Sequence, residues 1–138
     1  MLFRKNLPSG PDSMNGVYLA PCPNKPNCVC SLALRESDHY IEPFQFVDEP
    51  ENELKLLQAV MASMEGVGVI SVKTDYLHAE YRSRFLKFID DVEFYWDEQE
   101  QLCHVRSAAR VGYYDFGVNR KRIEQIREEF AQHHAQPE

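Results

Sequence analysis

The sequence predicts a single α+β domain in which an antiparallel sheet carries two helices on one face. The chain has 138 residues, of which 43% are hydrophobic and 27% charged, values that suit one folded domain with its own core. Two segments place apolar residues at helical spacing, and several others alternate between apolar and polar residues. Because residues 67–111 contain no proline, their alternating runs favour an antiparallel meander.

Residues 1–38 are predicted to form an irregular arm that packs on the domain surface. Five prolines between residues 8 and 26 interrupt any long helix there. The α+β domain is expected over residues 39–134, followed by a tail at 135–138. Within the domain, His39–Phe46 alternates loosely and contains Pro43, which favours an edge strand.

The first helix is expected to begin after Asp48, because this residue is a suitable cap and Pro50 lies near the first helical position. Apolar residues follow at helical spacing from Leu54 to Met64. Gly66 is expected to end this helix.

Four strand-like runs come next, and a helix closes the domain. The runs are Val67–Thr74, Tyr76–Ser83, Asp91–Asp97 and Leu102–Val111. Asn119 is expected to cap a helix from Arg120 to about His134. The resulting order, β-α-β-β-β-β-α, resembles the TATA-binding-protein-like topology, which by itself carries no function.

The charge balance disfavours some classes of partner. The chain has 15 Lys+Arg against 22 Asp+Glu, a net charge of −7, whereas proteins that bind nucleic acid are usually basic. No apolar run reaches the roughly 20 residues of a transmembrane segment, and no signal peptide precedes Pro8. We therefore expect a soluble cytoplasmic protein, with a periplasmic or envelope-associated location as the alternative if the N-terminus is truncated.

The four cysteines predict no metal site. Five residues separate Cys22 from Cys28, and one separates Cys28 from Cys30, whereas structural zinc sites pair cysteines two to four residues apart. Cys22 and Cys28 instead close a proline-rich loop, either as thiols or as a disulfide, depending on the compartment. No cofactor and no metal ion are expected.

The alternation of the strands gathers polar side chains on the sheet face that the helices leave open. These side chains are His78, Glu80, Arg82, Tyr95, His104, Arg106 and Arg110. Arginine donates two parallel hydrogen bonds to a carboxylate or phosphate, and a helix beginning near Asn119 adds unpaired N–H groups. An anion-binding site is the expected result, for a small molecule or a protein carboxylate.

The residues expected to bind this ligand are Arg82, Arg106, Arg110, Asp115, Asn119 and Arg120. The alternative is structural, since the arginines could instead pair with Glu80, Glu93 and Asp115 across neighbouring strands. Asp115 could also accept hydrogen bonds from the N–H groups that begin the last helix.

A non-catalytic binding or accessory protein is the leading hypothesis for function. One alternative is a small hydrolase that uses His78 or His104 with an arginine-stabilised oxyanion. Another is a structural module that binds proteins through its edge strand or its proline-rich arm. The chain contains no G-x-S-x-G, H-E-x-x-H, P-loop or dinucleotide-binding motif, so no particular enzymatic activity is predicted. The sequence predicts no oligomeric state either.

Two separated blocks of the sequence resemble a known family. Residues 21–29 resemble its Cys-Pro-x-x-Pro-Asn-Cys-Val opening, and residues 81–83, 88–93, 106–112 and 115–123 resemble its second block. The chain is thus similar to the domain-of-unknown-function family 1499, whose members resemble exported or membrane-anchored bacterial proteins and plastid proteins. The resemblance implies no substrate, but it places all six expected ligand-binding residues within the motif blocks.

Overall fold

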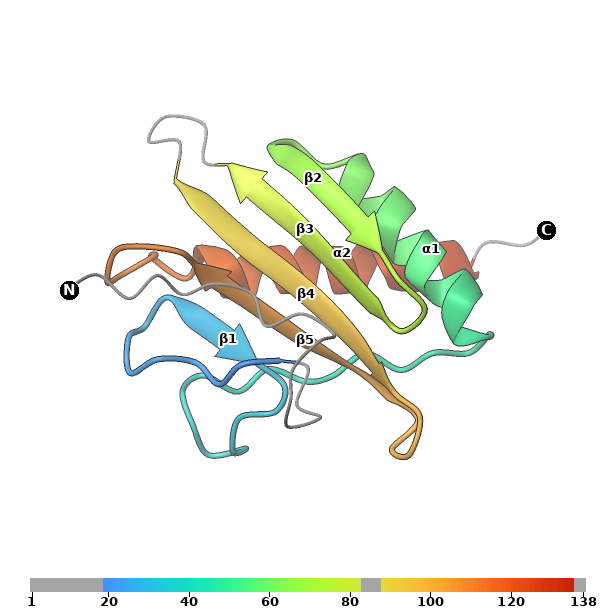
Figure 1. The fold of residues 1–138 in the computed structure, drawn as a ribbon, viewed down its shortest axis with the longest axis horizontal. Coiled ribbons are helices and arrows are strands. Elements are labelled where there is room, and N and C mark those ends of the chain that lie inside the picture. The colour runs from blue at the N-terminus through green and yellow to red at the C-terminus, as the bar shows by residue number, and fades with distance from the viewer. Residues whose placement is uncertain (1–18, 83–87, 136–138) are drawn as a thin grey trace.

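A computed structural model describes residues 19–82 and 88–135 (Figure 1). Its elements are β1 (Cys28–Cys30), α1 (Pro50–Ala62), β2 (Val67–Val72), β3 (Tyr76–Arg82), β4 (Ile89–Asp97), β5 (Leu102–Ala109) and α2 (Val118–Ala135). The five strands form one sheet in the order β1-β5-β4-β3-β2, and every neighbouring pair is antiparallel. The predicted α+β class and element order are confirmed, whereas the TATA-binding-protein-like topology stays a prediction.

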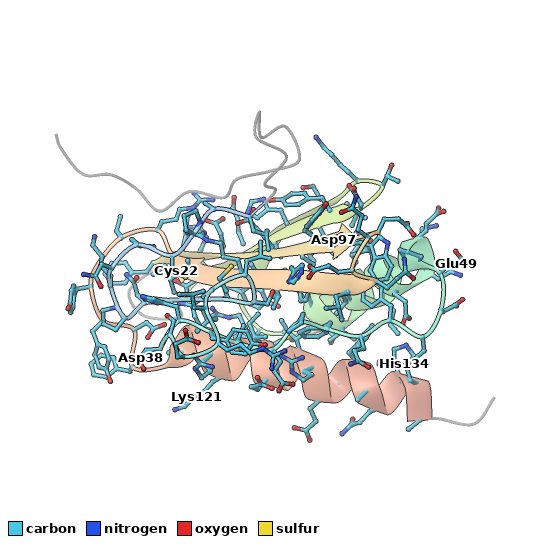
Figure 2. All side chains as sticks on the ribbon, turned by 90° about the horizontal axis from the view of Figure 1, so that it is seen from below. Cys22, Asp38, Glu49, Asp97, Lys121 and His134 are labelled. Atoms are coloured by element: carbon cyan, nitrogen blue, oxygen red, sulfur yellow. A yellow bond between two sulfur atoms is a disulfide. The ribbon has the colours of Figure 1, made fainter. Side chains whose placement is uncertain are left out.

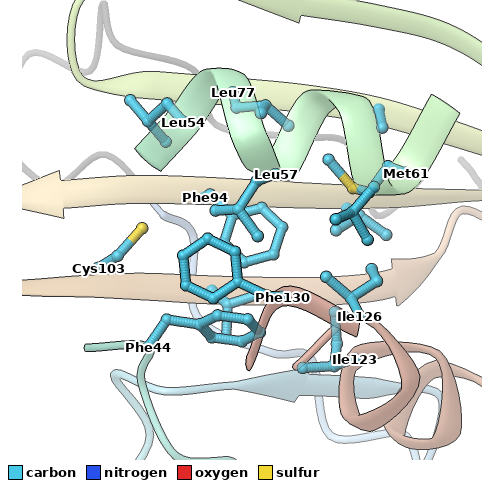
Figure 3. Close-up of a cluster of buried hydrophobic side chains, with 14 of the residues drawn as sticks. Phe44, Leu54, Leu57, Met61, Leu77, Phe94, Cys103, Ile123, Ile126 and Phe130 are labelled. Carbon is cyan, nitrogen blue, oxygen red and sulfur yellow. The ribbon is translucent and has the colours of Figure 1, made fainter. Parts of the chain in front are cut away.

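Both helices lie on the same face of the sheet (Figure 1), because each carries an apolar stripe at helical spacing. Leu54 and Leu57 of α1 and Ile123 and Ile126 of α2 are fully buried. They meet the apolar side chains of the central strands in one cluster (Figure 3).

Aromatic rings fill the centre of this cluster. Phe44, in the segment before α1, meets Phe94 of β4 edge to face, with ring centroids 5.0 Å apart. Phe46 stacks on Trp96 at the same centroid distance of 5.0 Å. The segment before α1 therefore contributes aromatic side chains to the core (Figure 3).

The edge strand predicted at His39–Phe46 is wrong. Only two isolated bridges form there, Cys30 with Tyr40 and Phe44 with Cys103. The place beside β5 is taken by β1, so this segment adds no strand to the sheet. Its loose alternation instead reflects side chains such as Ile41 and Phe44 that turn into the core.

The N-terminal arm is not wholly irregular, because β1 lies within it and pairs with β5. Leu19 and Cys30 pack against Tyr76 on the sheet face opposite the helices, since Tyr76 and its neighbour Leu77 point to opposite faces. Cys22 and Cys28 form a disulfide, visible as the yellow bond in Figure 2. Residues 1–18 of the arm lie outside the described residues, as do Ser83 and residues 136–138.

Both predicted helix starts need correction. The N-cap of α1 is Glu49, followed by Pro50, while Asp48 accepts a hydrogen bond from the Glu49 N–H. Asn119 lies inside α2 and is buried. The cap of α2 is Asp115, whose carboxylate accepts from the N–H groups of Gly117 and Asn119, so the predicted capping role of Asp115 is confirmed.

Strand β2 contains a bulge at the edge of the sheet. Val67 pairs with Tyr81 and Val69 with Glu80, which leaves Gly68 as the extra residue. Gly66, just before β2, has a φ of 91°, and a Cβ there would lie 2.8 Å from the carbonyl oxygen of Arg82. Glycine is therefore required at this position, although α1 already ends at Ala62.

Replacing Phe94 with alanine is expected to destabilise the protein by about 4 kcal/mol, because it opens a cavity in the middle of the aromatic cluster. The free energy of unfolding from urea titration measures this. Phe116→Ala is the matched control, since the Phe116 side chain is 76% exposed, and its cost should stay below about 1 kcal/mol. Equal losses in the two variants would contradict this account of the core.

Candidate functional site

The six residues expected to bind a ligand lie in three separate places. Arg106 and Arg110 lie on or just after β5, Arg82 at the end of β3, and Asp115, Asn119 and Arg120 around the start of α2. The structure therefore brings together only the last three as a local group.

Arg106 does not lie on an open face, because the N-terminal segment covers it. Its exposure is 1%, and its Nη2 donates to the carbonyl oxygen of Pro21 at 3.4 Å. Nη1 lies 3.6 Å from Oε1 of Glu93, whose Oε2 accepts a 2.5 Å hydrogen bond from the Tyr76 hydroxyl. The expectation of an accessible Arg106 is wrong, since alternation along a strand cannot reveal what packs over a face.

Arg110 is also paired, at the edge of the covered region. Its Nε and Nη2 donate to the two oxygens of Asp91 at 2.7 and 2.9 Å, and Nη2 donates to Glu80 at 2.8 Å. On the other side of Asp91, Nε2 of His78 lies 2.7 Å from Oδ1. The structural alternative predicted that these arginines form cross-strand ion pairs. This is confirmed for Arg106 with Glu93 and for Arg110 with Glu80.

The electrostatics of this cluster centre on Asp91, whose side chain is fully buried. Burial acts to raise its pKa, but hydrogen bonds from His78 and Arg110 outweigh burial and hold the pKa below the ordinary value. Asp91 is therefore ionised at neutral pH. The same contacts raise the pKa of Arg110, with the hydrogen bond to Asp91 as the largest cause.

Asn119 crosslinks the start of α2 to the rest of the domain. Its Oδ1 accepts from the Ser107 hydroxyl at 2.5 Å and from Nη1 of Arg122 at 3.1 Å. Its Nδ2 donates to Asp115 at 2.9 Å and to the carbonyl oxygen of Asn27 at 3.4 Å. These bonds occupy both ends of the amide, so Asn119 positions the local group.

A hollow of about 300 Å3 lies beside this junction, between the disulfide loop at residues 22–28 and the start of α2. We call it the loop hollow. Residues that line it include Lys25, Asp38, His39, Tyr113, Asp115 and Arg120. Figure 2 shows Asp38 close to the first turns of α2.

The cationic groups of the loop hollow come from distant parts of the sequence. Nη2 of Arg120 donates to the carbonyl oxygen of Asp38 at 2.9 Å, and Nδ1 of His39 lies 2.9 Å from the carbonyl oxygen of Cys28. Within residues 19–82 and 88–135, neither Lys25 nor Arg120 forms an ion pair with a carboxylate. Both side chains therefore place a positive charge at the loop hollow.

Sequence reasoning missed Lys25 and His39 as members of the site. Lys25 lies in the loop that the disulfide closes, and the alternating pattern predicts His39 in an edge strand. Arg82 is exposed and lines a different hollow, together with Lys121 and Arg122.

Two groups of histidine and carboxylate side chains have the spacing of metal ligands. They are His78, Glu80 and Asp91, and Asp97, Glu100 and His104. His78 and His104, considered as a possible acid–base pair, bind separate carboxylates: Nε2 of His104 lies 2.6 Å from Glu100. Nothing in the strand pattern predicted the carboxylate of Glu100, which belongs to the turn between β4 and β5.

A protein-family model described as "Protein of unknown function (DUF1499)" matches residues 18–130. The chain belongs to this family. The resemblance noted in the sequence is therefore confirmed. No curated protein and no solved structure matches the chain. In the described part of this DUF1499 chain, no helix is both long and apolar enough to cross a membrane.

The two blocks that carry the DUF1499 resemblance meet at the loop hollow. The first block supplies Lys25 and the disulfide loop, and the second supplies Asp115 and Arg120. Hydrogen bonds hold the blocks together, since Nδ2 of Asn27 donates to the carbonyl oxygen of Gly112 at 2.9 Å. The hollow is thus lined by both sequence blocks.

Replacing Asp91 with asparagine is expected to cost about 3 kcal/mol at pH 7, because it breaks a buried ion pair. Since the pKa of folded Asp91 lies below the ordinary value of an aspartate carboxyl group, its ionisation stabilises the native state fully above that ordinary value. The advantage disappears as the pH falls through the folded pKa. The stability gap between wild type and Asp91→Asn should therefore narrow below about pH 4.

Urea denaturation across this pH range measures the gap. Asp38→Asn serves as the control, because the Asp38 side chain is exposed and, among the residues that the structure describes, only its backbone carbonyl is engaged. A gap between wild type and Asp91→Asn that stays constant down to pH 2 would show that the ionisation of Asp91 does not stabilise the fold.

Proposed function

We propose that this DUF1499 domain is a non-catalytic binding or accessory protein that holds an anionic group in the loop hollow. The group is a phosphate or carboxylate of a small molecule, or a carboxylate of a protein. The observation that supports this is that Lys25 and Arg120 line one hollow without an ion pair to any carboxylate in the described residues.

The backbone around both cations is held before a ligand arrives. The Cys22–Cys28 disulfide closes the loop that carries Lys25, and the Lys25 N–H donates to the carbonyl oxygen of Pro23 at 2.7 Å. Arg120 is anchored by its bond to Asp38. Such preorganisation lowers the entropy lost on binding, which favours recognition of a small anion.

Asp115 and His39 also line the hollow. The carboxylate of Asp115 already accepts three hydrogen bonds, from the backbone of Gly117 and from the backbone and side chain of Asn119. It therefore acts as the cap of α2 and positions Arg120. His39 also lines the hollow, where its Nδ1 lies 2.9 Å from the carbonyl oxygen of Cys28.

The residues that line the hollow favour binding without catalysis. Cys28 contributes to its lining, but its sulfur is committed to the disulfide. No serine, threonine or free cysteine is found among the described lining residues, so a nucleophile of the type used in acyl transfer is not supported.

The disulfide also bears on location. Disulfides persist in oxidising compartments and are rare in the cytosol. We therefore favour the periplasmic or envelope-associated alternative over a cytoplasmic protein. Intact mass spectrometry of protein isolated without reductant tests the disulfide on which this location depends, because a bridged pair lacks two hydrogens.

Calorimetric titration with inorganic phosphate and with citrate, at low ionic strength, tests the binding proposal. Arg120→Gln and Lys25→Gln should each weaken binding by about tenfold, the loss of one charge-assisted hydrogen bond. Lys121→Gln is the matched control, because it removes the same charge from the next residue of α2 but lines the other hollow.

The result that would overturn the proposal is equal weakening by Lys121→Gln and Arg120→Gln, which would indicate nonspecific attraction to the helix start. Absence of binding of either anion to the wild-type chain would also refute it. Loss of binding in Arg82→Gln alone would move the anion to the hollow lined by Lys121 and Arg122.

A further inference from the structure

We propose that Asp97, Glu100 and His104 form a binding site for one divalent first-row transition-metal ion, of which Zn2+ is the best fit. One ligand atom from each residue lies within 4.8 Å of the others. The site lies where β4 turns into β5, at the opposite end of β5 from the loop hollow (Figure 1). It is independent of the proposed anion site.

The turn between the two strands fixes the carboxylate ligands. Oδ1 of Asp97 accepts hydrogen bonds from the N–H groups of Gln99 and Glu100 at 2.9 and 3.2 Å. The Gln101 N–H donates to the carbonyl oxygen of Asp97 at 2.8 Å, and Gln101 takes a φ of 56°. These bonds fix the Asp97 carboxylate in the turn, where one of its oxygens lies within 4.8 Å of the ligand atoms of Glu100 and His104.

The histidine ligand is held by a hydroxyl on its far side. The His104 side chain is buried, and its Nδ1 lies 2.9 Å from Oγ of Ser31. That hydroxyl oxygen also accepts the Val105 N–H at 2.8 Å, which fixes its position. The ring is thereby oriented with Nε2 toward Glu100.

The Ser31 hydroxyl suits both states of the site. In the tautomer with the proton on Nε2, Ser31 donates to Nδ1 and Nε2–H of His104 donates to Glu100. With metal, Nδ1 carries the proton and donates to Ser31, so that the lone pair of Nε2 is free to bind the ion. Metal-binding histidines commonly donate their second ring nitrogen to an oxygen in this way, which fixes the tautomer.

The group of Asp97, Glu100 and His104 differs in charge from the second histidine–carboxylate group. At His78, Glu80 and Asp91, the guanidinium of Arg110 already forms ion pairs with both carboxylates, so an ion would have to displace it. At Asp97 and Glu100, no lysine or arginine forms an ion pair within the residues described. Two carboxylates and a neutral imidazole therefore offer a charge that a divalent cation balances.

The donor set determines the class of ion. Imidazole nitrogen suits zinc, copper, iron and nickel, whereas Mg2+ and Ca2+ prefer oxygen ligands throughout. One nitrogen and two carboxylate oxygens therefore favour a first-row transition metal. The half-exposed Glu100 leaves the site open to solvent, and three protein ligands leave further positions to water.

The test uses the full chain and Co2+, whose visible absorption reports nitrogen and oxygen ligation, followed by displacement with Zn2+. We expect saturable one-to-one binding, with Glu100→Gln weakening Zn2+ affinity by at least about tenfold. Glu98→Gln should leave the affinity unchanged. It is the matched control, because Glu98 lies in the same turn but contacts Trp96 and Gln101 instead of His104.

Glu100→Gln is preferred to a His104 variant, because the His104 side chain is buried and its replacement would also disturb folding. Glutamine preserves an acceptor for Nε2 of His104, and the side chain is half exposed, so unfolding without metal should match that of wild type. Equal Co2+ binding by wild type and Glu100→Gln would place the ion elsewhere, such as at His133 and His134, and overturn the proposal. Absence of saturable Zn2+ binding, or Mg2+ binding as tight as Zn2+ binding, would overturn it too.

Discussion

The hydrogen bonds around Asn119 join the chain segments on which the rest of the structure depends. Its buried amide contacts β5 through Ser107, the disulfide loop through Asn27 and the cap of α2 through Asp115. A buried amide satisfied at both ends fixes one arrangement, because any other would leave polar atoms without partners. This junction therefore links the start of α2 to β5 and to the disulfide loop, beside the loop hollow.

The two faces of the sheet are stabilised by different physical means. The face under the helices is apolar and close-packed, whereas the opposite face buries the ion pairs of Arg106 and Arg110 beneath or beside the N-terminal segment. Burying charges costs free energy unless they are paired and hydrogen-bonded. The pairing of Glu93 with Arg106 across β4 and β5 therefore favours one strand register over its neighbours.

The sequence predicted the fold class because periodicity reports which faces of helices and strands are buried. It failed at β1, since three residues among prolines carry too little alternation to be recognised. At His39–Phe46, apolar side chains entering the core from an extended link gave a pattern similar to that of a strand. In both places tertiary contacts, which a local pattern does not contain, decided the structure.

The candidate sites were predictable to different degrees for the same reason. The pairing of Arg110 with Glu80 follows from strand alternation, and capping by Asp115 follows from its place before a helix. The burial of Arg106 depends on a segment that lies over the sheet. The contact between Ser31 and His104 joins residues 73 positions apart, and no spacing rule reaches that far.

The two outer strands limit how this molecule could meet another copy of itself. On one side β1 offers only three residues, and on the other the bulge at Gly68 disturbs the regular spacing of β2. Short or irregular borders are poor templates for a neighbouring chain to extend the sheet. Fibril-like stacking is therefore disfavoured, and recognition by this domain is left to side chains and loops.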